Sequence, residues 1–414
     1  MGRKMRIAFA DLSFSWPPQG GAQVNVYNTA LGLQEAGHEV HLFAPAYDDF
    51  WWHESFDPAA LAFPATPMPA TWARLTGTKL ADLFVRYIRP WRPDLVYFGL
   101  GHYFKPYVIE ALAEYPIVSR YYMYENLCLR GFTLFKEDQT CPNDFPRTPN
   151  VCRRCALMGW RDKIPTGEPD PFGYELLRSR ALAPAYHGLF LRALAQCRAV
   201  VVNNALAKER LEGYCQETHV IPGGVSVEQF EHEPLRDREE RERAAIFMPG
   251  RASDPLKGLD ILARTAEALA EWRSDFEVWV TETEDRLEQP WYKPLGWRDR
   301  RGVRDLYRQA DIVVVPSVWD EPYGLVGVEA MAAGRPLVAS RVGGLQAIVR
   351  EGETGYLFHR ESSASLAFYL NHLLDRPELR ARMGARGREI AEQEHTWRRI
   401  IERDYLPLLE RIAA

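Results

Sequence analysis

Two glutamates that lie eight positions apart, Glu321 and Glu329, are the residues of this sequence best suited to bind a ligand. An apolar run at 312–315 predicts a buried strand, and a helix is expected to begin near Leu325. Glu321 therefore falls in a loop and Glu329 inside the helix. A carboxylate that accepts hydrogen bonds from two vicinal hydroxyls recognises the edge of a ribose or a hexose. Isolated glutamates are more often solvated, so the surrounding segment decides between the two interpretations.

The start of the same helix adds a potential anion-binding element. The strand ends at Pro316, and after a loop Gly324 allows the backbone to approach a ligand closely. The exposed N–H groups of the helix start, at Gly324, Leu325 and Val326, can hold an anion. Ligands of open α/β sheets bind beyond the carboxyl ends of the strands. The segment therefore predicts a pocket for a phosphate and a sugar.

A second group of candidate residues lies in the segment 247–259, which reads FMPGRASDPLKGL. A strand is expected to end at Gly250, and the cations of Arg251 and Lys257 precede a helix that opens near Gly258. Cations in these positions stabilise the negative charge that grows on a departing nucleoside diphosphate. Taken alone, an arginine and a lysine in a loop are more often solvated.

Gly20 and Gly21 separate the first expected strand from the first expected helix. Without side chains, they let backbone amides approach a phosphate or the transferred sugar. Alone, the pair is also explained by a tight turn between strand and helix. Together with the other segments it is predicted to belong to the site.

Strand-length apolar runs alternate with helix-length segments along the whole chain, which indicates parallel sheets crossed by helices. A chain of 414 residues is expected to form two domains. The segment 231–243, EHEPLRDREERER, is almost wholly charged and is predicted to be the linker. The first domain is expected to cover 1–230 and the second 244–395, and the apolar helical face of 396–414 needs a surface to cover. Strands are expected at Arg6–Ala10, Glu39–Ala44, Leu95–Phe98, Ile117–Arg120, Ala199–Asn203, His219–Ile221, Ala245–Met248, Phe276–Val280, Ile312–Val315 and Pro336–Ala339.

Composition excludes several classes of partner. A formal net charge of -5 gives no general reason to bind nucleic acid, which requires many contacts from Lys and Arg to phosphate. The sequence has no apolar run long enough to span a membrane and no signal-peptide core. We therefore expect a cytoplasmic protein, and any membrane contact should be peripheral, at the inner face.

Four of the six cysteines, Cys128, Cys141, Cys152 and Cys155, lie in one irregular insertion. Four thiols in a short span could hold a structural zinc ion tetrahedrally. Only the last two have the close C-x2-C spacing, so reduced thiols or local disulfides remain the alternatives. A metal here would fasten a long loop and would take no part in catalysis.

The segment PSVWDEPYGLVGVEAMAAGRPLVAS, which contains both glutamates, resembles the signature of the family 4 glycosyltransferases. The segments LGWRDRRGVRDLYRQAD, HVIPGGVSVEQF and PPQGGAQVNVYNTALGLQEAGHEV resemble that family too. The resemblance implies an α/β protein of the GT-B fold, with two doubly wound parallel-sheet (Rossmann-like) domains facing across a cleft. It also implies that the last helix returns to the first domain.

The resemblance also implies the reaction and the roles of residues. It predicts a retaining transfer of a hexose-type sugar from a nucleotide-diphosphate donor to a glycan, lipid-linked or small-molecule acceptor. Glu321 would contact the hydroxyls of the donor sugar, Glu329 the ribose, and Arg251 and Lys257 the diphosphate. Enzymes of this fold need no divalent ion for transfer, and the sequence has no D-x-D triplet. No cofactor is therefore expected for catalysis.

The sequence departs from the family pattern on the acceptor side. Where relatives carry a histidine after the strand at 117–120, this chain has Tyr122. His102, at the end of the preceding strand, is a nearby candidate for a catalytic residue, and Glu125 could also face the acceptor. This departure keeps open a nucleotide-sugar-binding protein with weak or lost transferase activity. A nucleotide-sugar epimerase or a phosphorylase of the same fold is a further alternative that ranks below the transferase.

Overall fold

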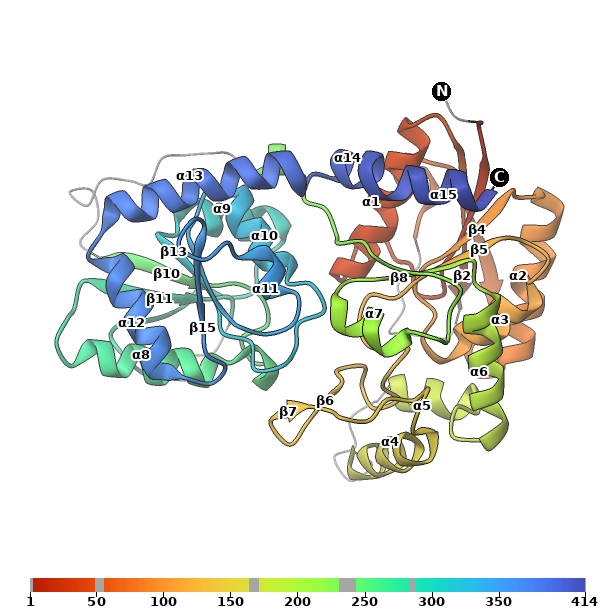
Figure 1. The fold of residues 1–414 in the computed structure, drawn as a ribbon, viewed down its shortest axis with the longest axis horizontal. Helices are drawn as coiled ribbons and strands as arrows, with labels where there is room; N and C mark the ends of the chain where they lie inside the picture. Colours follow the sequence, from red (N-terminus) through yellow and green to blue (C-terminus); the bar gives the residue numbers. More distant parts are fainter. Residues whose placement is uncertain (1–2, 49–55, 164–170, 231–242, 283–286, 414) are drawn as a thin grey trace. The chain divides into compact units, whose positions relative to one another are not determined.

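A computed structural model of the chain describes residues 3–48, 56–163, 171–230, 243–282 and 287–413. These residues divide into two compact units (Figure 1). Unit 1 comprises Met1–Lys136, Thr140–Pro222 and Ile400–Ala414, and unit 2 comprises Glu137–Gln139 and Gly223–Arg399. The expected linker, 231–243, lies outside the described residues except for Arg243.

The described residues of unit 1 form a parallel sheet in the order β3-β2-β1-β4-β5-β8-β9. Its strands are β1 Arg6–Ala10, β2 Glu39–Tyr47, β3 Ala65–Ala70, β4 Leu95–Phe98, β5 Ile117–Arg120, β8 Ala199–Val202 and β9 Thr218–Val220. The central strands are buried along their whole length because helices cover both faces of such a sheet. The strand order reverses between β1 and β4, which pair in parallel. Loops that follow these two strands therefore form the expected ligand position of unit 1.

The helices that connect these strands are α1 Gly21–Glu35, α2 Gly77–Trp91, α3 Lys105–Ala111, α6 Pro184–Gln196 and α7 Ala205–Leu211. Between β5 and β8 the chain makes a long insertion. It contains the two-stranded sheet β6 Phe135–Lys136 and β7 Gln139–Thr140, and the helices α4 Pro149–Lys163 and α5 Pro171–Arg178. Helix α4 lies at the edge of unit 1, away from the main sheet (Figure 1).

The end of the chain completes the core of unit 1. It comprises Ile400, the last residue of α14 Trp397–Ile400, a π-helical turn at Ile401–Tyr405, and α15 Leu406–Ala413. Tyr405 and Leu409 are fully buried in one hydrophobic cluster with β1 and α1. A side chain at Gly32 of α1 would lie 2.7 Å from Ile401, so glycine permits this close packing. The last residues are thus part of the first hydrophobic core.

The described residues of unit 2 form a second parallel sheet in the order β12-β11-β10-β13-β14-β15. Its strands are β10 Ala244–Met248, β11 Phe276–Val280, β12 Tyr292–Pro294, β13 Ile312–Val315, β14 Leu337–Ser340 and β15 Gly355–Phe358. Its helices are α8 Leu259–Ala270, α9 Arg300–Gln309, α10 Leu325–Ala332, α11 Leu345–Ile348, α12 Ser363–Leu374 and α13 Pro377–Glu394. The strand order reverses between β10 and β13. The loops after these two strands form the expected ligand position of unit 2.

The predicted architecture of two parallel-sheet α/β domains is confirmed, and β1, β4, β5, β11 and β13 begin and end at the predicted residues. Strand β3 was not predicted, because its sequence, ATPMPA, contains two prolines. Prolines are tolerated there because β3 is an edge strand that pairs only with β2. In the described part of the chain, no helix is long and apolar enough to cross a membrane.

We predict that Leu409→Ala destabilises unit 1 by about 2–5 kcal/mol, because a fully buried leucine leaves a cavity when it is truncated. Denaturant unfolding would measure the loss. The matched control is Glu410→Ala, an exposed neighbour in the same helix, for which a change within about 0.5 kcal/mol is expected. Equal stabilities of the two variants would show that the last helix is not part of the core.

Candidate functional site

In unit 2, the loops that follow β10 and β13 pack directly against each other. Gly258 has a φ of 79°, and a side chain there would lie 2.0 Å from the carbonyl oxygen of Pro316. The N–H of Val318 donates to the carbonyl of Leu256 at 3.0 Å. Only glycine permits this contact. Residues 255–257 form a 3-10 turn just before it, so the turn carries Lys257 to the end of β13.

The structure brings two predicted site residues, Lys257 and Glu321, into contact. Lys257 Nζ lies 2.6 Å from Glu321 Oε1. The hydroxyl of Ser317 and the indole N–H of Trp319 donate to the same oxygen, at 2.7 and 3.2 Å. In the described ranges, Oε2 of Glu321 has no hydrogen-bond partner, although only 8% of the side chain is exposed. A buried carboxylate is thus held by one oxygen and can accept hydrogen bonds with the other.

The loop that follows β14 fixes the backbone around Glu321. The N–H of Gly344 donates to the carbonyl of Glu321 at 2.7 Å, and a side chain at Gly343 would lie 2.2 Å from that carbonyl. The neighbouring Asp320 accepts from Arg360 at 2.7 Å and from the N–H of Gly343 at 3.2 Å. These hydrogen bonds hold the loop that contains Asp320 and Glu321 on both sides. Glu321 is therefore already positioned in the absence of a ligand.

Helix α10 begins directly after this loop. Gly324 has a φ of 94°, and a side chain there would lie 2.5 Å from Leu345. Among the described residues, no side chain caps the helix start. The N–H groups of Leu325 and Val326 are therefore not taken by a side-chain oxygen, as an anion-binding helix start requires.

Glu329 lies on α10 and faces α9. Its Oε2 is 3.0 Å from the hydroxyl of Tyr307. Burial raises the pKa of Glu329, while Tyr307, Arg300 and Arg304 partly offset this effect. Burial also lowers the pKa of Arg300. In the part of the chain that the structure describes, no hydrogen bond joins Glu329 to Glu321, so the two carboxylates can serve different parts of a ligand.

Arg251 follows Gly250 at the end of β10 and is exposed to solvent. Gly250 has a φ of 95°, and its carbonyl accepts from the hydroxyl of Thr281 at 2.5 Å. The turn is fixed, while the side chain of Arg251 is open to a ligand. Its role on a diphosphate stays a prediction.

Unit 1 contains the other predicted residues. Gly20 caps α1 with an extended backbone, at a φ of -158°, that any residue could adopt. A side chain built there would meet no atom within 4 Å. The carboxamide of Gln23 accepts from the N–H of Gly20 at 2.9 Å and ties the preceding turn to Gly21 and the helix. The fold therefore does not require glycine at position 20. Its predicted role in ligand binding stays a prediction.

His102 lies just beyond β4, where its Nδ1 is 3.2 Å from Glu175 Oε2 and its ring stacks on Phe132. Burial lowers the pKa of His102, but the charge and hydrogen bond of Glu175 outweigh it, so the pKa is raised overall. Sequence reasoning missed Glu175, which lies 73 positions away on α5 of the insertion. Nothing in its sequence neighbourhood indicates this pairing.

Sequence reasoning also missed two buried ionisable residues that interact electrostatically with His102. Asp11, at the end of β1, accepts from the N–H groups of Ser13 and Leu100 at 2.9 and 2.7 Å, and burial raises its pKa to about 6. Lys105 donates to the carbonyl of Arg120 at 2.6 Å, and burial lowers its pKa to about 8. Both lie at the switch point of the sheet, where ligands of such domains bind.

Tyr122, at the position of the missing histidine, is buried with its ring 5.2 Å from the guanidinium of Arg120. The backbone N–H groups of Tyr122 and Met123 donate to the carboxylate of Glu125 at 3.0 and 2.8 Å. Glu125 therefore holds the turn after β5. Asn204 caps α7, and its side chain accepts from the N–H of Ala207.

All four clustered cysteines are free thiols. Cys152 and Cys155 lie on α4, and burial raises the pKa of Cys152 to about 12. The described residues contain no group of three or more histidines, cysteines or acids that could hold a metal ion. A structural zinc ion held by Cys128, Cys141, Cys152 and Cys155 stays a prediction.

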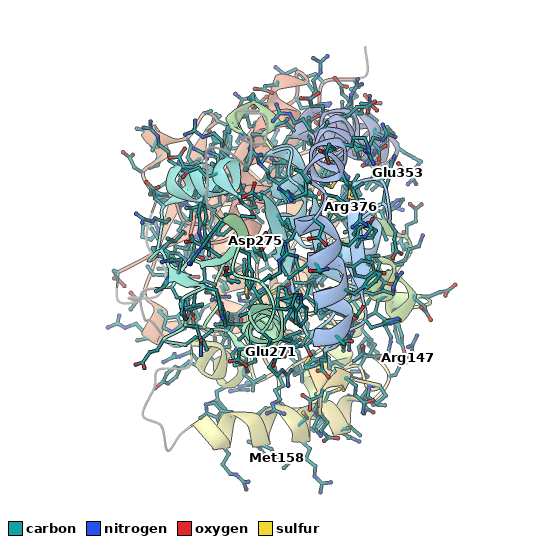
Figure 2. All side chains as sticks on the ribbon, turned by 90° about the vertical axis from the view of Figure 1, so that its left-hand side faces the viewer. Arg147, Met158, Glu271, Asp275, Glu353 and Arg376 are labelled. Atoms are coloured by element: carbon teal, nitrogen blue, oxygen red, sulfur yellow. The ribbon has the colours of Figure 1, made fainter. Side chains whose placement is uncertain are left out.

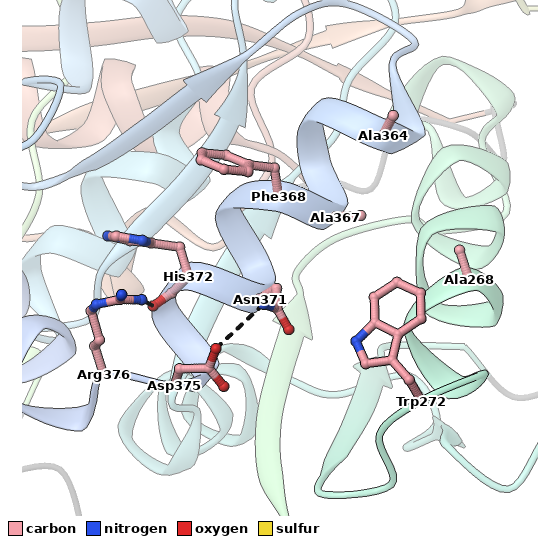
Figure 3. A pocket seen from close by; sticks show the side chains of 9 residues that line it. All are labelled: Ala268, Trp272, Ala364, Ala367, Phe368, Asn371, His372, Asp375 and Arg376. Atoms are coloured by element: carbon pink, nitrogen blue, oxygen red, sulfur yellow. Dashed lines mark hydrogen bonds between the residues drawn. The ribbon is translucent and has the colours of Figure 1, made fainter.

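A hollow of about 610 Å³ lies elsewhere in unit 2, between α8 and α12 (Figure 3). Trp272 and Phe368 stand on its two sides, and Asn371 and Asp375 contribute polar groups. None of the predicted site residues lines it.

We predict that Glu175→Gln lowers the pKa of His102, because the charge of Glu175 then no longer offsets the burial of the imidazole. Titration of the histidine ring by NMR would measure the change. Because the folded-state pKa is raised, the stability from this pair is present at low pH and is lost as the pH rises through that pKa. The Glu175→Gln variant should therefore be less stable than the unaltered protein only at pH values below the folded-state pKa of His102. Glu110→Gln, which removes an exposed partner of Arg192, is the control and should leave His102 unchanged.

Two family models match the chain, one in each unit. The model described as Glycosyltransferase Family 4 matches residues 19–122, and the model described as Glycosyl transferases group 1 matches residues 291–390. The chain is also similar to a phosphatidyl-myo-inositol mannosyltransferase of Mycobacterium leprae, with 30% identity over 206 residues that cover 48% of this chain and 55% of that protein. The chain spans about half the length of the curated relatives it matches.

Solved structures share the whole architecture at low identity. A sucrose-phosphate synthase from Thermosynechococcus elongatus has a TM-score of 0.67 and 19% identity, covering 99% of this chain and 98% of that one. HepE of Anabaena, in complex with UDP and glucose, has a TM-score of 0.65 and 18% identity, covering 98% and 99%. These likenesses show the fold, which is that of the GT-B glycosyltransferases. Models of glycosyltransferase families thus match segments of both units, and the chain resembles the family 4 glycosyltransferases in those segments.

Proposed function

We propose that this protein transfers a hexose-type sugar from a nucleoside diphosphate to an acceptor hydroxyl, with retention of the anomeric configuration. The observation that carries the proposal is the state of Glu321. Three donors, Lys257, Ser317 and Trp319, converge on its Oε1, which leaves Oε2 for a ligand. A buried carboxylate with one available oxygen, beside a cation and an uncapped helix start, suits a sugar attached to a diphosphate.

Different residues then bind the sugar, the ribose and the diphosphate of the donor. Oε2 of Glu321 accepts hydrogen bonds from the sugar hydroxyls, and Glu329 accepts them from the ribose. Lys257, Arg251 and the N–H groups of Leu325 and Val326 stabilise the diphosphate. Because Lys257 already sits at 2.6 Å from Glu321, one cation lies close to both the sugar and its leaving group. HepE of Anabaena binds UDP and glucose, which supports a nucleotide-sugar donor.

The transfer itself forms one bond and breaks one. The bond between the anomeric carbon and the phosphate oxygen breaks, and the acceptor oxygen forms the new bond on the same face. The acceptor proton passes to the departing phosphate. Cations near the phosphate stabilise its developing charge. The same cations support transfer without a divalent ion, as does the lack of a D-x-D triplet in the sequence.

His102 would act on the acceptor side of the reaction. When it is protonated and Nδ1 faces Glu175, Nε2 also carries a proton and can donate a hydrogen bond to a ligand. The acceptor class is a glycan, a lipid-linked sugar or a small molecule. The mannosyltransferase of Mycobacterium leprae acts, by its name, on phosphatidyl-myo-inositol, so lipid-linked acceptors belong among the first to be tried.

A thermal-shift series followed by a transfer assay tests the proposed function. Among UDP-, GDP- and ADP-sugars, the true donor should raise the melting temperature more than its nucleoside diphosphate alone, because Glu321 binds the sugar. Glu321→Gln should remove that additional rise, whereas Glu267→Gln, at an exposed position of α8, should keep it. The proposal fails if no nucleotide sugar stabilises the protein.

Mass spectrometry of the products separates the alternatives. Glycosylated acceptor with the donor's anomeric configuration is the expected result, and an inverted product would refute retention. Binding without transfer would indicate a nucleotide-sugar-binding protein. Interconversion of the donor without any acceptor would indicate an epimerase.

A further inference from the structure

Helix α4 of the insertion exposes an unusual amount of apolar surface. Of the ten large apolar side chains that are exposed among the described residues, five lie on α4 and α5. Three are on α4 alone: Val151, Leu157 and Met158, which are 50%, 48% and 50% exposed. Single exposed apolar residues need no explanation, but their concentration on one helix indicates an interaction surface.

The exposed residues of α4 share one face. Cys152 and Ala156 are buried, whereas Val151, Arg154, Leu157, Met158 and Arg161 are exposed, as expected for positions three and four apart on a helix. Figure 2 shows Met158 on the outer side of this helix, where side chains extend away from the protein. The helix is therefore anchored by one face and presents a mixed apolar and arginine face, here called the α4 face.

The charge of this segment differs in sign from that of the chain. Residues 147–161, RTPNVCRRCALMGWR, carry four arginines and no acid, whereas the whole chain has a formal net charge of -5. Arg153 turns inward and donates to the carbonyl of Ala183. Arg154 and Arg161 stay on the exposed face. Such a local positive field attracts an anionic surface.

Charge also decides which occupant fits the α4 face. A second copy of this chain, docked symmetrically through the same face, would bring Arg154 and Arg161 close to their own counterparts. Like charges opposed in an interface are costly. The headgroups of an anionic bilayer instead pair with the arginines, while the acyl boundary accepts the apolar side chains.

We propose that the α4 face docks this protein onto an anionic phospholipid bilayer. The helix lies in the plane of the interface, with Val151, Leu157 and Met158 in the acyl boundary and Arg154 and Arg161 at the lipid phosphates. The binding is peripheral and reversible. It does not depend on the proposed transferase activity, because none of these side chains belongs to the candidate site.

Co-sedimentation of the full chain with vesicles tests this proposal. The protein should bind vesicles that contain phosphatidylglycerol, bind pure phosphatidylcholine more weakly, and be released by salt. Arg154→Glu with Arg161→Glu should lower the partition coefficient by at least ~30-fold, since each basic residue near an anionic surface contributes about one factor of five or six. Leu157→Ser with Met158→Ser should lower it at least tenfold.

Matched controls come from unit 2. Arg264→Glu removes an exposed arginine, and Trp272→Ser removes an exposed aromatic side chain. Both should bind vesicles like the unaltered protein. Unchanged melting temperatures of the α4 variants would show that folding is intact. Glu321→Gln should also bind vesicles normally, which separates failure of the membrane proposal from failure of the proposed function.

Three results would overturn the proposal. The protein could fail to bind anionic vesicles, or it could bind them equally well in the α4 variants. It could also sediment as a dimer that the α4 variants dissociate, which would identify a second copy of the chain as the occupant. Transfer to a soluble acceptor should remain unchanged in the α4 variants.

Discussion

The ion pair between Lys257 and Glu321 is the interaction on which the candidate site depends. It exists because β10 and β13 are neighbours in the sheet and because Gly258 lets their loops touch at Pro316. With Ser317 and Trp319 on the same carboxylate oxygen, the pair is held in one geometry at 2.6 Å. A buried pair of this kind contributes little to stability, and removal of one partner leaves an uncompensated charge. Its arrangement is better explained by the binding of a polar ligand than by folding.

Unit 1 also brings ionisable side chains together where loops follow neighbouring strands of its sheet. Asp11, Lys105 and the pair of His102 with Glu175 place ionisable groups at the point where the strand order reverses. Burial raises the pKa of Asp11 and lowers that of Lys105, so each is shifted towards its neutral form. Such perturbed groups concentrate at functional sites. Glu175 comes from the insertion, which therefore contributes to the candidate site of unit 1 and also carries the α4 face.

The sequence predicts the fold well because most strands are continuous apolar runs between helix-length segments. The exceptions have local causes: β3 contains two prolines, and β12 and β15 are edge strands of three and four residues. The pairing of Lys257 with Glu321 could not be predicted, because the two residues are 64 positions apart and meet only through the sheet order. For the same reason Glu175 was missed. The cysteine spacing leaves the zinc site a prediction, because the described residues contain no group of three or more potential metal ligands.

A double-mutant cycle of donor binding tests the central claim most directly. Calorimetric titration of the stabilising nucleotide sugar would compare Lys257→Met, Glu321→Gln and the double variant with the unaltered protein. If the two residues act as one unit, each single variant weakens binding and the effects differ from additivity by about 0.5–3 kcal/mol. Unchanged affinity in both single variants, or losses that simply add, would contradict the claim that this pair holds the donor.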